Sequence, residues 1–240
     1  MSPEPDPSRP ASDRGADAPA GEFLLRLCHD LRSCLRSIQP HTEMLLRTGQ
    51  SDVAEEFERK LGFVLDGTRR LDALLDGLAA YAIALQVDGA GFRPIALDSV
   101  LRNALLMTGK RHPGIASQVI SGILPRVSGD ADRLRQIFEI LIAGALHRAT
   151  GELRIQIDAQ PHAAGWLISV KDHGAPLAAD DLETMFRPFA RPHHRSRLES
   201  GLELATCRVI VERHGGQIWA ETDSREGGTF RFTLPAIAEG

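Results

Sequence analysis

The sequence predicts a two-domain α+β protein, in which a long antiparallel helical hairpin precedes a mixed α/β domain. Apolar residues recur at three- and four-residue steps over residues 24–78, which indicates amphipathic helices. From residue 96 onward, helical periodicity alternates with short runs of alternating polar and apolar residues, which are typical of strands. The 240 residues are enough for one or two small domains and no more.

Residues 1–21 hold five of the fourteen prolines and are expected to be a disordered tail. The hairpin domain is predicted to cover residues 22–88. Its first helix has one apolar face, formed by Leu24, Leu27, Leu31, Leu35, Ile38, Thr42 and Leu45. Since one hairpin leaves this face half covered, two copies are expected to close a four-helix bundle, which predicts a homodimer.

Residues 89–95 are interpreted as a linker, and the second domain is predicted to cover residues 96–237. Its helices are expected at residues 97–108, 131–148 and 201–214, and Asp130 is the expected N-cap of the second. Its strands are expected at residues 118–123, 152–159, 166–171, 217–221 and 229–234, the last two forming a hairpin. Residues 173–200 are expected to be irregular, and a loop of that length is usually a lid or disordered.

Composition excludes several classes of protein. A net charge of −4 and only 5% aromatic residues argue against nucleic-acid binding, which usually needs a basic surface and stacking side chains. No apolar run reaches the roughly 18 residues of a membrane span, and residues 1–20 lack the apolar core of a secretory signal. Cys28, Cys34 and Cys207 lack CxxC spacing, so they are expected to be reduced thiols in a cytoplasmic protein with no membrane partner.

His29 is the first candidate for chemistry. On a helix it projects about 150° away from the centre of the apolar stripe, so it is not expected to be a core histidine. The adjacent carboxylate of Asp30 can orient the imidazole or take its proton, which makes the ring a better nucleophile. A surface histidine without a catalytic role has the same pattern, and these two residues alone leave both interpretations open.

Four motifs resemble those of the sensor histidine kinase family and occur in that family's order. The phosphoacceptor box is resembled by HDLRSCLRSI, and the asparagine-box segment by PRVSGDADRLRQIFEILIAGAL. The first glycine box with its Phe-x-x-Phe element is resembled by VKDHGAPLAADDLETMFRPFAR, and the second with its closing hairpin by GLELATCRVIVERHGGQIWAETDSREGGTFRFTLP. Together they cover nearly all of residues 22–235. The resemblance implies a dimerisation and histidine-phosphotransfer hairpin, followed by a Bergerat-type ATP-binding α/β sandwich.

The resemblance also implies roles for six residues. In the hairpin, His29 accepts the phosphoryl group, Asp30 is the adjacent acid or base, and Ser33 helps to dephosphorylate a response regulator.

In the sandwich, Asp172 corresponds to the carboxylate that hydrogen-bonds the adenine amino group, and Gly174 lets the backbone approach the base. Gly201 belongs to the second glycine box, whose backbone amides face the triphosphate. ATP and Mg²⁺ are the cofactors that the family implies.

The sequence departs from the family where nucleotide chemistry is most specific. Ile140 and Gly144 stand in place of the two box asparagines, the second of which is a magnesium ligand, so no protein ligand for a metal is expected. Pro176 replaces a glycine of the first box, and Glu199 and Glu203 replace glycines of the second. A Glu203 carboxylate ~5 Å from a phosphate charge would cost about 3 kcal/mol at an effective dielectric near 20.

Two functional hypotheses follow. The chain is an autokinase that phosphorylates His29 and passes the group to an aspartate of a response-regulator receiver domain. Alternatively, it is an ATP-independent histidine phosphotransferase, phosphatase or docking pseudokinase. Since only the short tail precedes the hairpin, the signal is expected to come from a separate sensor protein or kinase.

Overall fold

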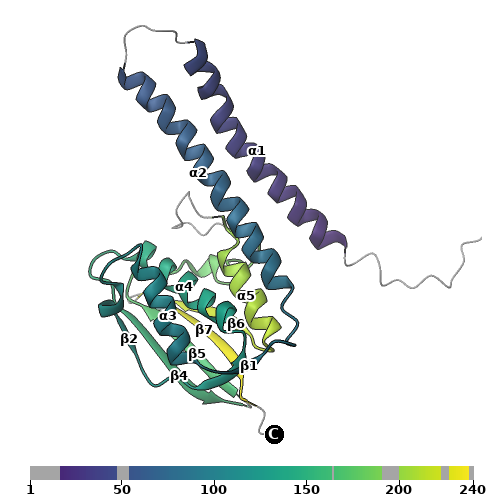
Figure 1. Ribbon diagram of the computed structural model, residues 1–240, viewed down its shortest axis with the longest axis vertical. Coiled ribbons are helices and arrows are strands. Elements are labelled where there is room, and N and C mark those ends of the chain that lie inside the picture. Colours follow the sequence, from purple (N-terminus) through teal and green to yellow (C-terminus); the bar gives the residue numbers. More distant parts are fainter. Residues whose placement is uncertain (1–16, 48–53, 164, 191–199, 223–226, 238–240) are drawn as a thin grey trace, which may run out of the picture. The chain divides into compact units, whose positions relative to one another are not determined.

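The computed structural model describes residues 17–47, 54–163, 165–190, 200–222 and 227–237 (Figure 1). The chain divides into two compact units, Met1–Asp72 and Ala73–Gly240. Two long helices come first, and a mixed α/β sandwich follows, so the predicted α+β fold class is confirmed.

The hairpin consists of α1 (Asp17–Arg47) and α2 (Ala54–Leu85). Helix α1 begins inside the stretch that was expected to be disordered, and for residues 17–21 that expectation was wrong. Ala18 and Ala20 are strong helix formers, and a proline at Pro19 is tolerated because first-turn amides have no partner within the helix. The rest of the expected tail, residues 1–16, lies outside the described residues.

A close approach between the helices of the first unit occurs at Gly67. A Cβ atom on Gly67 would lie 2.5 Å from Cγ1 of Ile38, so this contact requires glycine. Cys34 is buried, whereas Leu35 and Phe63 are still 44% and 45% exposed. Apolar side chains of this hairpin therefore remain uncovered in a single chain, and the four-helix dimer stays a prediction.

The last turns of α2 belong to the second unit, so the division between units falls within this helix and not in the expected linker at 89–95. Ala84 is fully buried in the core of the second unit. The expected linker also contains the start of a strand, β1 (Arg93–Ala96), which pairs antiparallel with β3 (Arg126–Gly129). These two short strands carry too little alternation to be recognised from the sequence.

The main sheet has five strands in the order β2-β4-β5-β7-β6. Their bounds are β2 (Val119–Ser121), β4 (Ile155–His162), β5 (Gly165–Asp172), β6 (Ile218–Thr222) and β7 (Gly228–Pro235). Only the β2–β4 pair is parallel. Alternate residues of β7, including Phe230 and Phe232, are buried, so one face of the sheet contacts the core.

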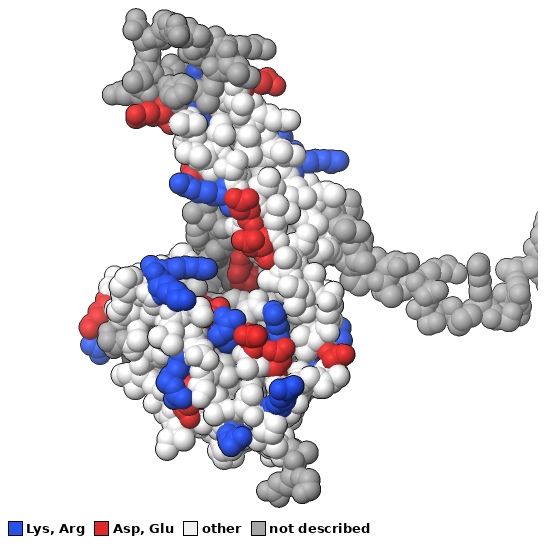
Figure 2. All heavy atoms as spheres, in the orientation of Figure 1, with Lys and Arg blue, Asp and Glu red and all other residues white. Residues whose placement is uncertain are grey.

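Three helices cover that face of the sheet, as Figure 1 shows: α3 (Leu97–Gly109), α4 (Ala131–Arg148) and α5 (Glu203–Arg213). Between β5 and α5 the described chain holds only turns and a short 3₁₀ segment, Ala179–Asp181. The predicted N-cap of α4 is confirmed, because the Asp130 carboxylate accepts hydrogen bonds from the amides of Asp132 and Arg133. Basic and acidic side chains are interspersed on the face of this unit shown in Figure 2.

His214 ties three segments of the second unit together. Its Nε2 accepts a hydrogen bond from the Asp130 amide at 3.0 Å, and its Nδ1 lies 2.7 Å from the Ile210 carbonyl oxygen. The ring stacks on Phe92 with centroids 4.2 Å apart. Burial lowers the pKa of His214 below its usual value, so the neutral ring is the form that the fold contains.

The acid sensitivity of the second unit is predicted to depend on His214. The folded pKa of His214 lies below the unfolded value of 6.5. Its contribution to the unfolding free energy is therefore complete above pH 6.5 and is lost as the pH falls toward the folded pKa. His214→Gln should flatten the fall in unfolding free energy between about pH 7.5 and about pH 5. Both tryptophans lie in this unit, so urea unfolding followed by their fluorescence reports it selectively. The exposed His112→Gln serves as the control, and equal slopes in the two variants would contradict the assignment.

Candidate functional site

His29 lies on an exposed face of α1. Its side chain is 73% exposed, and its Nδ1 lies 3.2 Å from Oδ1 of Asp30, which is itself nearly buried. A carboxylate at Nδ1 favours the tautomer that carries its proton there, which leaves Nε2 as the nucleophilic nitrogen. Ser33 is also exposed and follows His29 by one helical turn, so the two lie on the same side of α1.

The second group of expected site residues lies at the end of β5. Asp172 is the last residue of that strand, and its side chain is only 2% exposed. Its Oδ2 accepts a hydrogen bond from Nη2 of Arg148 at 2.5 Å, and its Oδ1 accepts one from the Gly174 amide at 3.1 Å. Both carboxylate oxygens are therefore engaged by the chain itself.

Arg148 comes from the last turn of α4, where a cation interacts favourably with the helix dipole. Its guanidinium carbon lies 5.2 Å from the centroid of the Phe230 ring, a cation–π distance. Within the described part of the chain, the buried Nε has no hydrogen-bond partner. An unsatisfied buried donor costs about 1–3 kcal/mol, so the pair with Asp172 is formed in spite of that cost. No motif in the sequence points to Arg148.

Backbone segments pack closely around the end of β5 at Asp172. A Cβ atom on Gly174 would lie 2.6 Å from the Arg148 carbonyl oxygen, and that oxygen also accepts a hydrogen bond from the Ala175 amide. A Cβ atom on Gly227 would lie 2.2 Å from the Asp172 carbonyl oxygen, and Gly227 has a φ of +77°. Glycine is thus required at both positions, and it brings three backbone segments together around the carboxylate.

The second glycine-box segment forms the N-terminus of α5. Oε1 of Glu203 accepts hydrogen bonds from the amide and the hydroxyl of Ser200, at 2.8 and 2.7 Å, and Oε2 accepts one from the Gly201 amide at 3.1 Å. The Ser200 hydroxyl oxygen in turn accepts a bond from the Leu202 amide. Ser200 and Glu203 therefore hold together the turn that leads into α5, which begins at Glu203.

The positions of the missing asparagines lie on α4, close to Arg148. A Cβ atom on Gly144 would lie 3.3 Å from Nη1 of Arg148, so the small residue at 144 leaves room for the guanidinium. Ile140 packs against the core of the second unit. Among the described residues, no group of three or more His, Cys, Asp or Glu side chains is placed to hold a metal ion.

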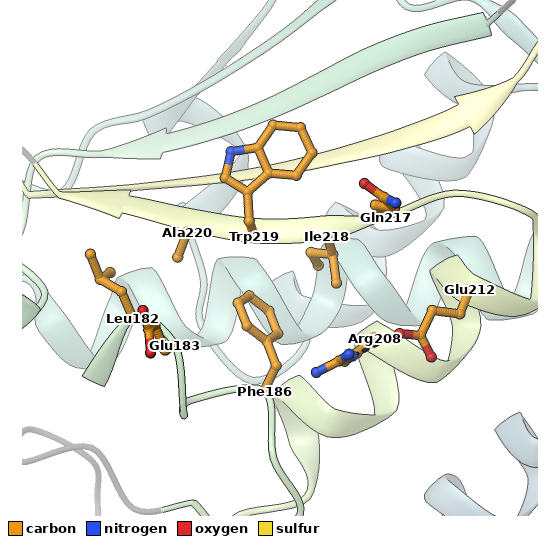
Figure 3. Close-up of a pocket in the computed structure, with 9 residues that line it drawn as sticks. All are labelled: Leu182, Glu183, Phe186, Arg208, Glu212, Gln217, Ile218, Trp219 and Ala220. Atoms are coloured by element: carbon orange, nitrogen blue, oxygen red, sulfur yellow. Dashed lines mark hydrogen bonds and ion pairs between the residues drawn. The ribbon is translucent and has the colours of Figure 1, made fainter. Parts of the chain in front are cut away.

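A cavity of about 560 Å³ lies elsewhere in this unit, between α5 and β6 (Figure 3). Phe186 and Ile218 line it, together with an ion pair between Arg208 and Glu212, whose atoms are 2.7 Å apart. Asp172, Gly174 and Gly201 are not among its lining residues.

Comparison with known proteins finds relatives that match most of the chain. Residues 129–238 match the family of histidine kinase-, DNA gyrase B- and HSP90-like ATPases. Over 222 residues the chain is 28% identical to cyanobacterial phytochrome A of Nostoc sp., which covers 92% of this chain and 29% of that protein. It is 30% identical over 224 residues to the sensor protein KdpD of Escherichia coli, which covers 89% of this chain and 24% of KdpD. The chain belongs to the sensor histidine kinase family.

Solved structures of such kinases have the same fold. The histidine kinase ThkA, in its complex with the response regulator protein TrrA, has a TM-score of 0.67 at 20% identity, covering 93% of this chain and 64% of ThkA. Acinetobacter baumannii AdeS has a TM-score of 0.59 at 17% identity, covering 86% of this chain and 97% of AdeS. The chain spans about three-tenths of the length of its first curated relatives. None of its helices in the described ranges is long and apolar enough to cross a membrane.

In the second unit, the groups expected to receive the nucleotide that its ATPase family implies already have partners within the chain. The carboxylate expected to receive adenine is engaged by Arg148. The amides of Ser200 and Gly201 donate to Glu203, and position 144 offers no magnesium ligand.

Replacing Gly174 is predicted to destabilise the second unit. In Gly174→Ala the new methyl group meets the Arg148 carbonyl oxygen, so the unfolding free energy should fall by about 1–3 kcal/mol. Urea unfolding followed by tryptophan fluorescence measures the loss. Gly151→Ala is the matched control, since nothing lies within 4 Å of its added methyl, and it should be nearly neutral. Equal stability of the two variants would show that the backbone does not pack around Asp172 as described.

Proposed function

We propose that this chain carries a phosphoryl group on His29 and exchanges it with an aspartate of a response-regulator receiver domain. The contact that carries the proposal is the 3.2 Å approach of the Asp30 carboxylate to Nδ1 of an exposed imidazole. The complex of ThkA with TrrA shows that a protein of this fold binds a response regulator.

The transfer needs only groups that the hairpin supplies. Nε2 of His29 attacks the phosphorus of an aspartyl phosphate in line, the P–O bond to the aspartate breaks, and the aspartate leaves as a carboxylate. The ring gains positive character in this step, and the Asp30 carboxylate at Nδ1 stabilises that charge or takes the proton. Reversal of the same step phosphorylates the regulator.

Ser33 and the helical hairpin have supporting roles in this proposal. The exposed Ser33 hydroxyl, one turn from His29, orients a water molecule toward the regulator's aspartyl phosphate and so favours its hydrolysis. Two copies of the hairpin associate through exposed apolar side chains such as Leu35 and Phe63, which gives a homodimer with two phosphoacceptor faces. No step of this proposed transfer uses a nucleotide, and the groups of the sandwich at Asp172 and Glu203 already have partners within the chain.

Phosphorylation is predicted to occur at His29 and to depend on Asp30. With phosphoramidate, a small-molecule phosphoryl donor, the acid-labile label should map to His29 by mass spectrometry and be lost in His29→Ala. Asp30→Asn should slow labelling by about a hundredfold, because the ring loses its proton acceptor. His41→Ala, a substitution on the same helix, should leave labelling unchanged. Label spread evenly over the exposed histidines would refute the assignment.

A further inference from the structure

We infer that the nucleotide pocket of the second unit is filled by two of the chain's own side chains, Arg148 at the base end and Glu203 at the phosphate end, and that it excludes ATP. The inference concerns different residues from the transfer through His29 and goes beyond it. Three independent contacts within Ala73–Gly240 carry it.

At the base end, a guanidinium takes the place of a hydrogen-bond donor on a ligand. An adenine amino group would donate an N–H to Asp172, and Nη2 of Arg148 already donates to that carboxylate at 2.5 Å. The other oxygen accepts from the Gly174 amide, and the aspartate side chain is 2% exposed. The guanidinium also lies over Phe230, so a planar cation occupies the space next to the carboxylate. A base that approached Asp172 would therefore compete with Arg148 for the carboxylate and for the space beside it.

At the phosphate end, a carboxylate takes the place of the ligand's anion. The amides of Ser200 and Gly201 stand in the turn just before α5, and backbone N–H groups at the start of a helix commonly hold phosphates. Both donate to Glu203, which is tethered in the same turn and therefore competes at a high effective concentration. A phosphate that approached these two amides would find both already donating to Glu203. It would also be repelled by the negative charge of that carboxylate.

Helix α2 closes the same end from outside. A Cβ atom on Gly77 would lie 2.2 Å from Oγ of Ser200, so the backbone of α2 contacts this serine directly. Ser200 is completely buried, and Gly201 and Leu202 are buried beside it. The turn before α5 is thus covered by a helix, and the Glu203 carboxylate already accepts hydrogen bonds from its amides.

The test removes the side chains of Arg148 and Glu203 and measures whether the chain then binds ATP. In the wild-type chain, about 2 mM ATP with Mg²⁺ should leave the unfolding midpoint of the second unit unchanged. In Arg148→Ala combined with Glu203→Gly, the midpoint should rise with ATP, and calorimetry should show affinity at least about a hundredfold above the wild-type limit. The matched control is Arg208→Ala with Glu212→Gly, which removes an ion pair of the same residue types on α5 outside the pocket. It should gain nothing.

Two outcomes would overturn the inference. One is ATP binding to the wild-type chain at millimolar concentration. The other is a double variant that folds, as judged by circular dichroism, and binds ATP no better than the wild type. If the double variant does not fold, Arg148→Gln combined with Glu203→Gln decides the question, since it removes both charges with a smaller change in side-chain size. It should raise affinity for ATP measurably, and no gain would count against the inference. Labelling of His29 by phosphoramidate should be unchanged in every variant, so a failure here is distinguishable from a failure of the proposed transfer.

Discussion

A buried ion pair between Arg148 and Asp172 joins the end of α4 to the end of β5, and the surrounding backbone is arranged around it. Removing two charges from water is costly, and the attraction between them offsets that cost only when each is well placed. Here the aspartate has a second donor in the Gly174 amide, and the arginine carbonyl accepts the Ala175 amide. The side chain and the main chain of Arg148 therefore bind the end of β5 and the loop that follows it, and this pair connects α4 to that end of the sheet.

The elements that the sequence predicts well are those with local signals. The helix that begins after Asp130 has a capping residue and a continuous apolar face, and the structure gives it the expected start and end, Ala131–Arg148. Strands β1 and β3 are four residues each, so their alternation is too short to identify without the partner strand. The start of α1 was expected too late, because proline-rich composition outweighed the two alanines that flank Pro19.

The candidate site shows a different limit of sequence reasoning. The positions of His29, Asp30, Asp172 and Gly174 follow from motif spacing, and the structure brings each pair into contact. The pairing of Arg148 with Asp172 spans 24 residues and depends on how α4 packs against the sheet, which no local pattern encodes. For Glu203 the sequence predicts only a repulsive charge toward phosphate. Its contacts with Ser200 and Gly201 depend on a turn in which Gly201 has a φ of +79°, and that geometry is visible only in three dimensions.

The close contact at Gly77 restricts the rotational setting of α2. Successive residues of a helix are about 100° apart around its axis, so turning α2 by one residue would present Asp76 or Leu78 to Ser200. Neither side chain fits where a single Cβ atom would already lie 2.2 Å from the serine oxygen. Because only glycine fits at position 77, this one contact fixes how the last turns of α2 are rotated about their axis relative to the start of α5.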